Sequence, residues 1–119
     1  MRVLIVNDSG DTKHIREALK NAGASIGCIC PVDTATIDNV LRHLDQAVHG
    51  RHAEYDVVVI ELADRTLAER IAYAVVDRVP WQTVVMVGNG PLSDPTYMVS
   101  FAPNILGVIA EMKRMRLIM

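Results

Sequence analysis

The sequence predicts an α/β protein built as a three-layer αβα sandwich, in which a five-stranded parallel sheet lies between two layers of helices. Short apolar runs alternate along the chain with apolar stripes at helical spacing. The run Val-Val-Val-Ile at 57–60 contains no polar position, which is typical of a strand buried on both faces of a parallel sheet. Strands that alternate with helices in this way form a doubly wound sheet.

Three strands and two helices are predicted in the first half of the chain. The strands lie at 3–6, 24–30 and 57–60, and each is a short apolar run. The helices between them end near Gly23 and Gly50, because glycine commonly terminates helices. Their apolar stripes consist of Ile15, Ala18, Leu19 and Ala22, and of Ile37, Val40, Leu41, Leu44 and Val48.

A third helix and a fourth strand follow. Thr66 and Glu69 have the spacing of a capping box, which predicts that a helix begins there. Pro80 ends this helix, and 83–87 is the fourth apolar strand.

The last thirty residues allow two interpretations. The pair Asp94-Pro95 predicts a short helix that reaches Phe101, followed by a fifth strand at Ile105–Ile109 and a last helix from Ala110. The alternative is one helix from Pro103, since the apolar residues after it also have helical spacing. Gly107 and the β-branched run favour the strand.

Composition places the chain among globular proteins and narrows the function classes. The 119 residues form one predicted domain, 1–119, with 50% hydrophobic and 22% charged residues. A formal net charge of −2 gives no general attraction to nucleic acid. We find no signal peptide and no membrane span, and therefore expect a cytoplasmic protein. A phosphate-binding P-loop and a serine nucleophile elbow are also missing from the sequence, and we predict no enzymatic activity.

Acidic residues follow two of the predicted strands. Asp8 comes after the first strand, and Glu61 after the third. Ligands of open parallel sheets bind at the carboxyl ends of the strands, and two carboxylates that converge there can recruit a cation such as Mg²⁺. The alternative is that Asp8 and Asp11 only cap the first helix.

Three stretches of the chain resemble the receiver domain of bacterial response regulators. They are "RVLIVND", "ALKNAGA" and "YDVVVIEL". The resemblance implies a flavodoxin-like architecture of five β/α units, with an acid pair after strand one and a phosphorylated aspartate at the end of strand three. It also implies a threonine or serine that ends strand four and a lysine that ends strand five.

This chain departs from the receiver pattern at most of those positions. Asn7 and Asp8 stand at the acid pair, and Glu61 stands at the phosphoacceptor. Gly88 stands at the hydroxyl position, and Val108 stands at the lysine if 105–109 is strand five. Phosphoryl transfer depends on positioning and charge stabilisation. We therefore predict a pseudo-receiver that regulates by protein–protein contact in a two-component or transcriptional pathway. Glu61 either mimics a phosphorylated aspartate or is a solvated strand-end residue.

The resemblance also carries expectations about ligands and partners. Asp8 and Glu61 are the expected ligands of any residual Mg²⁺, and no other cofactor is expected. The stretch at 2–24 is also similar to the amino-terminal domain of ANTAR-type antitermination regulators, in which a separate helical domain binds RNA. We thus expect nucleic acid to be contacted only through another domain. A protein partner or a second copy is expected on the carboxyl-terminal face, formed by Tyr97, Met98, Phe101, Ile105, Met112 and Met115. The alternative is that these apolar residues belong to the core.

Two rival sites remain open. The turn Ser9–Thr12 is similar to the phosphate loop of flavodoxins, which predicts an FMN site with Trp81 and Tyr97 as stacking residues. Against this, Asp8 and Asp11 would repel a phosphate. A metal site at His43, His49 and His52 is disfavoured because Gly50 interrupts the helix, and a polar helix end is the preferred interpretation.

Overall fold

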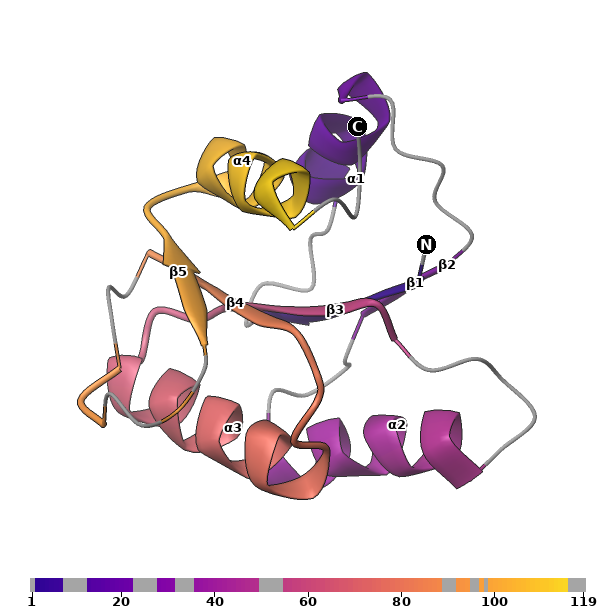
Figure 1. Cartoon of the computed structure of the whole chain (residues 1–119), viewed down its shortest axis with the longest axis vertical. Coiled ribbons are helices and arrows are strands. Elements are labelled where there is room, and N and C mark those ends of the chain that lie inside the picture. Colours follow the sequence, from indigo (N-terminus) through magenta and orange to yellow (C-terminus); the bar gives the residue numbers. More distant parts are fainter. Residues whose placement is uncertain are drawn as a thin grey trace.

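The chain forms a parallel β-sheet with helices on both faces (Figure 1). This computed structural model describes residues 2–7, 13–22, 28–31, 36–49, 55–88, 92–94, 97 and 99–115, without the side chains of 28–31 and 46–49. The α/β class and the parallel sheet predicted from the sequence are confirmed. The elements are β1 (Arg2–Asn7), α1 (Lys13–Asn21), β2 (Cys28–Pro31), α2 (Ile37–His49), β3 (Val57–Glu61), α3 (Arg65–Arg78), β4 (Val84–Val87), β5 (Ser100–Ala102) and α4 (Ile105–Arg114).

The strands are ordered β2-β1-β3-β4-β5, and each neighbouring pair is parallel. The chain leaves β1 toward β2 on one side and returns to β3 on the other. The order therefore reverses between β1 and β3, where Asn7 lies opposite Glu61 in register. In open α/β sheets, ligands bind outside the carboxyl ends of the strands at such a reversal.

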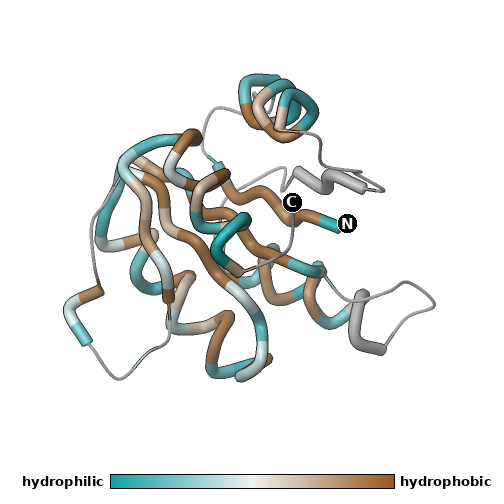
Figure 2. Tube along the Cα trace, turned by 45° about the horizontal axis from the view of Figure 1, so that its top comes forward, coloured by the Kyte–Doolittle hydropathy of each residue, from teal (hydrophilic) through white to brown (hydrophobic). Residues whose placement is uncertain are grey.

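Alternate residues of β1, β3 and β4 belong to two separate apolar clusters. Leu4 and Val6 of β1 belong to the cluster beneath α2 and α3, whereas Val3 and Ile5 belong to the cluster beneath α1 and α4. This follows from the two-residue period of a strand. Figure 2 shows that the inner strands are hydrophobic along their length, whereas the helices are mixed.

The N-cap of helix α3 lies two residues earlier than the sequence predicts. The cap is Asp64, whose Oδ1 accepts a hydrogen bond from the Leu67 backbone N–H at 3.1 Å. Thr66 lies inside the helix. The capping-box prediction for Thr66 and Glu69 is therefore wrong, because the acidic residue two positions earlier satisfies the N-terminal N–H group.

The region after Gly88 differs most from the expectations. Residues 105–109, predicted as a strand, form the first half of α4, and Phe101, predicted to end a helix, lies in β5. Asn104 caps α4 by accepting from the Gly107 N–H at 3.1 Å. Gly107 is needed where α4 approaches β5, because a Cβ there would lie 2.9 Å from the Cβ of Ala102. The glycine thus marks a close helix–strand contact, not a strand, and the single-helix alternative is correct.

The connection between β4 and β5 is attached to α3 by side chains one helical turn apart. Glu69 accepts hydrogen bonds from the N–H and the hydroxyl of Ser93, at 3.0 and 2.9 Å. One turn later, Tyr73 Oη accepts from the Asp94 N–H at 3.1 Å. A further turn on, Asp77 accepts from the Tyr97 hydroxyl at 2.9 Å. The rings of the two tyrosines lie 4.5 Å apart, so the connection is held at three levels of the helix.

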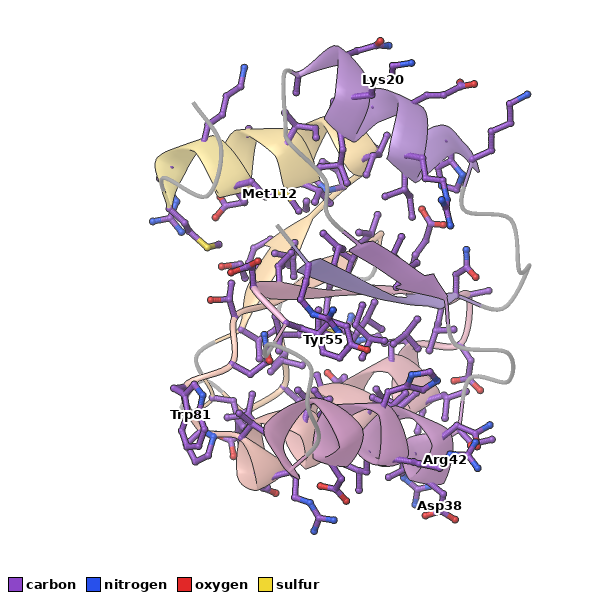
Figure 3. All side chains as sticks on the ribbon, turned by 90° about the vertical axis from the view of Figure 1, so that its right-hand side faces the viewer. Lys20, Asp38, Arg42, Tyr55, Trp81 and Met112 are labelled. Carbon is purple, nitrogen blue, oxygen red and sulfur yellow. The ribbon has the colours of Figure 1, made fainter. Side chains whose placement is uncertain are left out.

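The predicted contact surface on the carboxyl-terminal face is only partly a surface. Met112 is fully buried and points from α4 toward the sheet (Figure 3), so for this residue the alternative, a place in the core, is correct. Ile105 and Met115 are half-buried and pack against the cluster beneath α4. Phe101 is exposed, and Met98 lies outside the described residues. None of the described helices has the length and apolar character needed to cross a membrane.

Candidate functional site

Asn7 and Glu61 meet at the carboxyl end of the sheet. They are paired in register as the last residues of β1 and β3. Both continue the alternation that points Val3 and Val57 toward α1 and α4, so their side chains leave the sheet on that side. Asn7 is buried, whereas the side chain of Glu61 is 30% exposed. The sequence analysis expected Asp8 and Glu61 to converge at this edge, and Asp8 lies outside the described residues.

Glu61 contacts His14, which the sequence analysis missed. His14 Nε2 lies 3.1 Å from Oε1 and 3.2 Å from Oε2 of the Glu61 carboxylate. A carboxylate only accepts hydrogen bonds, so Nε2 carries the hydrogen and donates it. The signal that could have found His14 is its place in the first turn of α1. The helix that follows a strand in a β/α unit begins over the carboxyl end of the sheet.

Among the described residues, Gly88 follows β4 and Ala102 ends β5, and neither has a polar side chain. Gly88 follows β4 with φ at 83°, a left-handed conformation that favours glycine, and its N–H donates to the Ala102 carbonyl at 2.8 Å. A Cβ at Gly88 would meet nothing within 4 Å. The hollow beside it, of about 390 Å³, is lined by Gly88, Phe101, Ala102 and Pro103.

Val108 is not at the end of strand five. It is fully buried in α4, and the residue that ends β5 is Ala102. The assignment of Val108 to the lysine position is therefore wrong, because it depended on a strand at 105–109. The residue at the end of strand five is Ala102 instead, and its side chain, like that of valine, has no amine. Lys113 lies in the last turn of α4.

Several of the predicted site residues lie outside the described residues. They include Asp8, so the Mg²⁺ site predicted at Asp8 and Glu61 stays a prediction, and His52. His43 is half-buried on α2. Across the part of the chain that the structure describes, no three His, Cys, Asp or Glu side chains are grouped so that they could hold a metal ion.

The residues proposed for a flavin site do not come together as that site requires. The turn Ser9–Thr12 lies outside the described residues. Trp81 is 66% exposed in the turn before β4, at the amino end of the sheet (Figure 3). Tyr97 packs on Tyr73 of α3. Neither ring is placed to stack at the carboxyl edge beside Asn7 and Glu61.

Comparisons of the chain with protein-family models, with curated proteins and with solved structures gave no match.

Proposed function

We propose that this chain is a signalling domain of the receiver type that regulates by contact with other proteins and has lost phosphotransfer. The observation that carries the proposal is the contact of Glu61 with His14 at 3.1 Å. The carboxylate at the phosphoacceptor position is already held by a side chain of the same molecule. The neighbouring strand ends, Gly88 and Ala102, supply neither a hydroxyl nor an amine.

The strand order supports this proposal. The order β2-β1-β3-β4-β5 is that of flavodoxin-like sheets, in which the ligand site lies between β1 and β3. Receiver domains share this architecture. The residues that depart from the receiver pattern therefore gather at one edge of the sheet and are not scattered over the molecule.

The chemistry of these residues opposes phosphorylation. An attacking carboxylate must lie in line with the leaving oxygen, and the charge on the transferred group must be stabilised. Glu61 is one methylene longer than aspartate, and His14 holds its carboxylate from the first turn of α1. Without an amine at Ala102 or a hydroxyl at Gly88, two of the groups that stabilise a bound phosphoryl in receivers are missing. Regulation by contact requires none of them.

Intact-mass spectrometry after incubation with acetyl phosphate and Mg²⁺ tests the proposal. We expect the wild-type protein to gain no phosphoryl mass, and Glu69→Asp provides the matched control for the same substitution away from the site. A gain on Glu61→Asp, or on Glu61→Asp combined with His14→Ala, would indicate that the scaffold still presents the pocket. A phosphoryl adduct on the wild type, mapped to Glu61 or Asp8, would overturn the proposal.

A further inference from the structure

A groove lies between α1 and α4 on the outer side of one helical layer. Its volume is about 450 Å³, which is within the range of small-molecule sites. Ala18 and Ala22 lie one turn apart, and their short side chains leave the space open. Leu106 of α4 lines the groove from the other helix and is 73% exposed. The other lining residues are His14, Glu17, Asn21 and Ile109.

The dimensions of the groove suit a small ligand better than a helix of a partner protein. On α1 the lining extends from His14 to Ala22, about 12 Å along the helix axis. On α4 it consists of Leu106 and Ile109, which lie within one turn. A docked helix is held by apolar anchors at positions i, i+3 or i+4 and i+7, over two turns or more. One turn of α4 is too short for that, whereas an alkyl chain fits along the groove.

Acidic groups lie at the end of the groove where α1 begins. Glu17 lines the groove, and its side chain is 63% exposed. Its distance of 4.0 Å from the exposed Lys13 ammonium makes that ion pair a weak one, which a ligand can replace. His14 also lines the groove and contacts the Glu61 carboxylate at 3.1 Å. Two carboxylates at this end are complementary to a cation.

The basic residues of the two helices leave this end of the groove free for a cation. Lys20 points away from α1 into solvent (Figure 3), and Lys13 and Arg16 share its side of the helix by their spacing. Lys113 is one turn beyond Ile109 on the groove side of α4, in the last turn of that helix. Both helices follow parallel strands and begin at the carboxyl edge of the sheet, so Lys113 lies toward the opposite end of the groove. A bound cation is therefore directed to the end near Glu17.

We infer that the groove between α1 and α4 binds a small primary alkylamine in its protonated form. The ammonium group donates to the Glu17 carboxylate, and the alkyl chain lies on Ala18, Ala22 and Leu106. This site goes beyond the proposed function and does not depend on it. Because His14 belongs both to the groove and to the contact with Glu61, a bound amine would also lie beside the side chain that holds that carboxylate.

Octylamine, which is protonated at pH 7, and octanoate, an anion with the same chain length, test the inference. Titrations of the full chain followed by backbone amide NMR shifts give both the dissociation constants and the place of binding. We expect octylammonium to bind about ten-fold more tightly than octanoate, because only the cation pairs with Glu17. The shifts should map to α1 and α4. From butylamine through hexylamine to octylamine, each added methylene should tighten binding by up to about four-fold.

Two pairs of variants separate the electrostatic and the apolar contributions. Glu17→Gln should remove the preference for octylammonium, whereas Glu111→Gln should not, because Glu111 pairs with Arg114 and does not line the groove. Ala18→Leu fills the groove and should weaken octylammonium about ten-fold or more. Ala74→Leu adds the same volume to α3, on the other face of the sheet, and should leave the affinity unchanged. Thermal unfolding shows which variants remain folded, and the exposed position of Glu17 keeps the first pair informative if Ala18→Leu does not fold.

Three results would overturn the inference. One is equal affinity for octylammonium and octanoate, or a preference that Glu17→Gln leaves unchanged. Another is binding that maps outside α1 and α4 or that a folded Ala18→Leu variant retains. The third is a concentration-dependent dimer that Leu106→Asp abolishes, because a second copy would then occupy the groove. No phosphoryl donor is present in these titrations, so failure here leaves the mass-spectrometric result on phosphotransfer standing.

Discussion

The two helical layers of this molecule differ in the side-chain contacts between their helices. Helices α2 and α3 are bridged by Arg78, which donates to both oxygens of Asp45 at 2.8 and 2.5 Å, and α3 also binds the β4–β5 connection through Glu69 and Asp77. Helices α1 and α4 cover an equally buried cluster but leave a groove above Ala18. Among the described residues, side-chain pairs join α3 to α2 and to the β4–β5 connection, whereas a groove lies between α1 and α4.

Charge separates the layers as well. Helices α2 and α3 carry balanced charges, with the acids Asp38, Asp45, Glu69 and Asp77 against the bases Arg42, Arg65, Arg70 and Arg78. Helices α1 and α4 carry five basic and two acidic residues. The two faces of the sheet therefore differ in how the charges of their helices are distributed, balanced on one face and in positive excess on the other.

The largest expected effect comes from removing a buried side chain beneath each helical layer, and it shows whether the two apolar clusters are equally well packed. Met112→Ala in α4 and Ile71→Ala in α3 each remove a side chain with no exposed surface, and each should lower the free energy of unfolding by about 2–5 kcal/mol. Leu106→Ala is the matched control on α4 and should cost less than about 0.5 kcal/mol. Urea denaturation measures all three. A small loss for Met112→Ala alone would mean that the α1–α4 layer is loosely packed.

A smaller effect tests how closely α4 approaches the sheet. In Gly107→Ala the new methyl would lie 2.9 Å from Ala102 Cβ and 3.0 Å from Pro103 Cδ. The overpacking penalty of about 1–3 kcal/mol should exceed the helix-propensity gain of about 1 kcal/mol. Net destabilisation in urea unfolding is therefore expected. A stabilised variant would contradict the close packing of α4 on β5. Ala110→Gly, at an exposed position of the same helix, measures the difference in helix propensity between alanine and glycine without that contact.

A weaker effect concerns the bridge between α2 and α3. The pair Asp45–Arg78 is partly exposed, with side-chain exposures of 37% and 51%. A double-mutant cycle of Asp45→Asn and Arg78→Gln should therefore give a coupling free energy of only about 0.2–1 kcal/mol. The coupling should shrink at high salt. A coupling that salt leaves unchanged would show that the bridge is shielded from solvent more than its exposure indicates.

The smallest effect is the pH dependence of the attachment between α3 and the β4–β5 connection. The hydrogen bond from the Ser93 hydroxyl lowers the pKa of Glu69 below 4.5, with help from the Ser93 N–H and from Arg65. The hydrogen bond to Asp77 raises the pKa of Tyr97 above 10.0, helped by desolvation and by the nearby charge of Asp94.

The two shifts act at opposite ends of the pH scale. Glu69 contributes stability that is present above pH 4.5 and is lost as pH falls through its lowered pKa. Tyr97 contributes stability that is present below pH 10.0 and is lost as pH rises through its raised pKa. Amide exchange of Ser93 and Tyr97 against pH measures both limits. Glu69→Gln should abolish only the loss of stability at low pH, and Tyr97→Phe should abolish only the loss at high pH. If Glu69→Gln instead changed the behaviour at high pH, or Tyr97→Phe that at low pH, these contacts would be contradicted.

The sequence predicted the inner part of the sheet well and its last part poorly, for one physical reason. A run such as 57–60 is apolar at every position, and only a strand buried on both faces accommodates that pattern in a short segment. The run at 105–109 is also apolar, but its spacing fits a helix as well as a strand. Local pattern could not choose between them, because the choice depended on β5 forming at 100–102.

The sequence by itself determined the α/β class and the strands β1, β3 and β4, since residue periodicity follows from local chemistry. The pairing of Asn7 with Glu61 required β1 and β3 to lie side by side. Only the tertiary structure decided that His14 holds Glu61, that Ala102 ends the last strand, and that α1 and α4 leave a groove between them. These features join residues far apart in the chain. They depend on which elements lie side by side, and residue spacing within one segment carries no information about that.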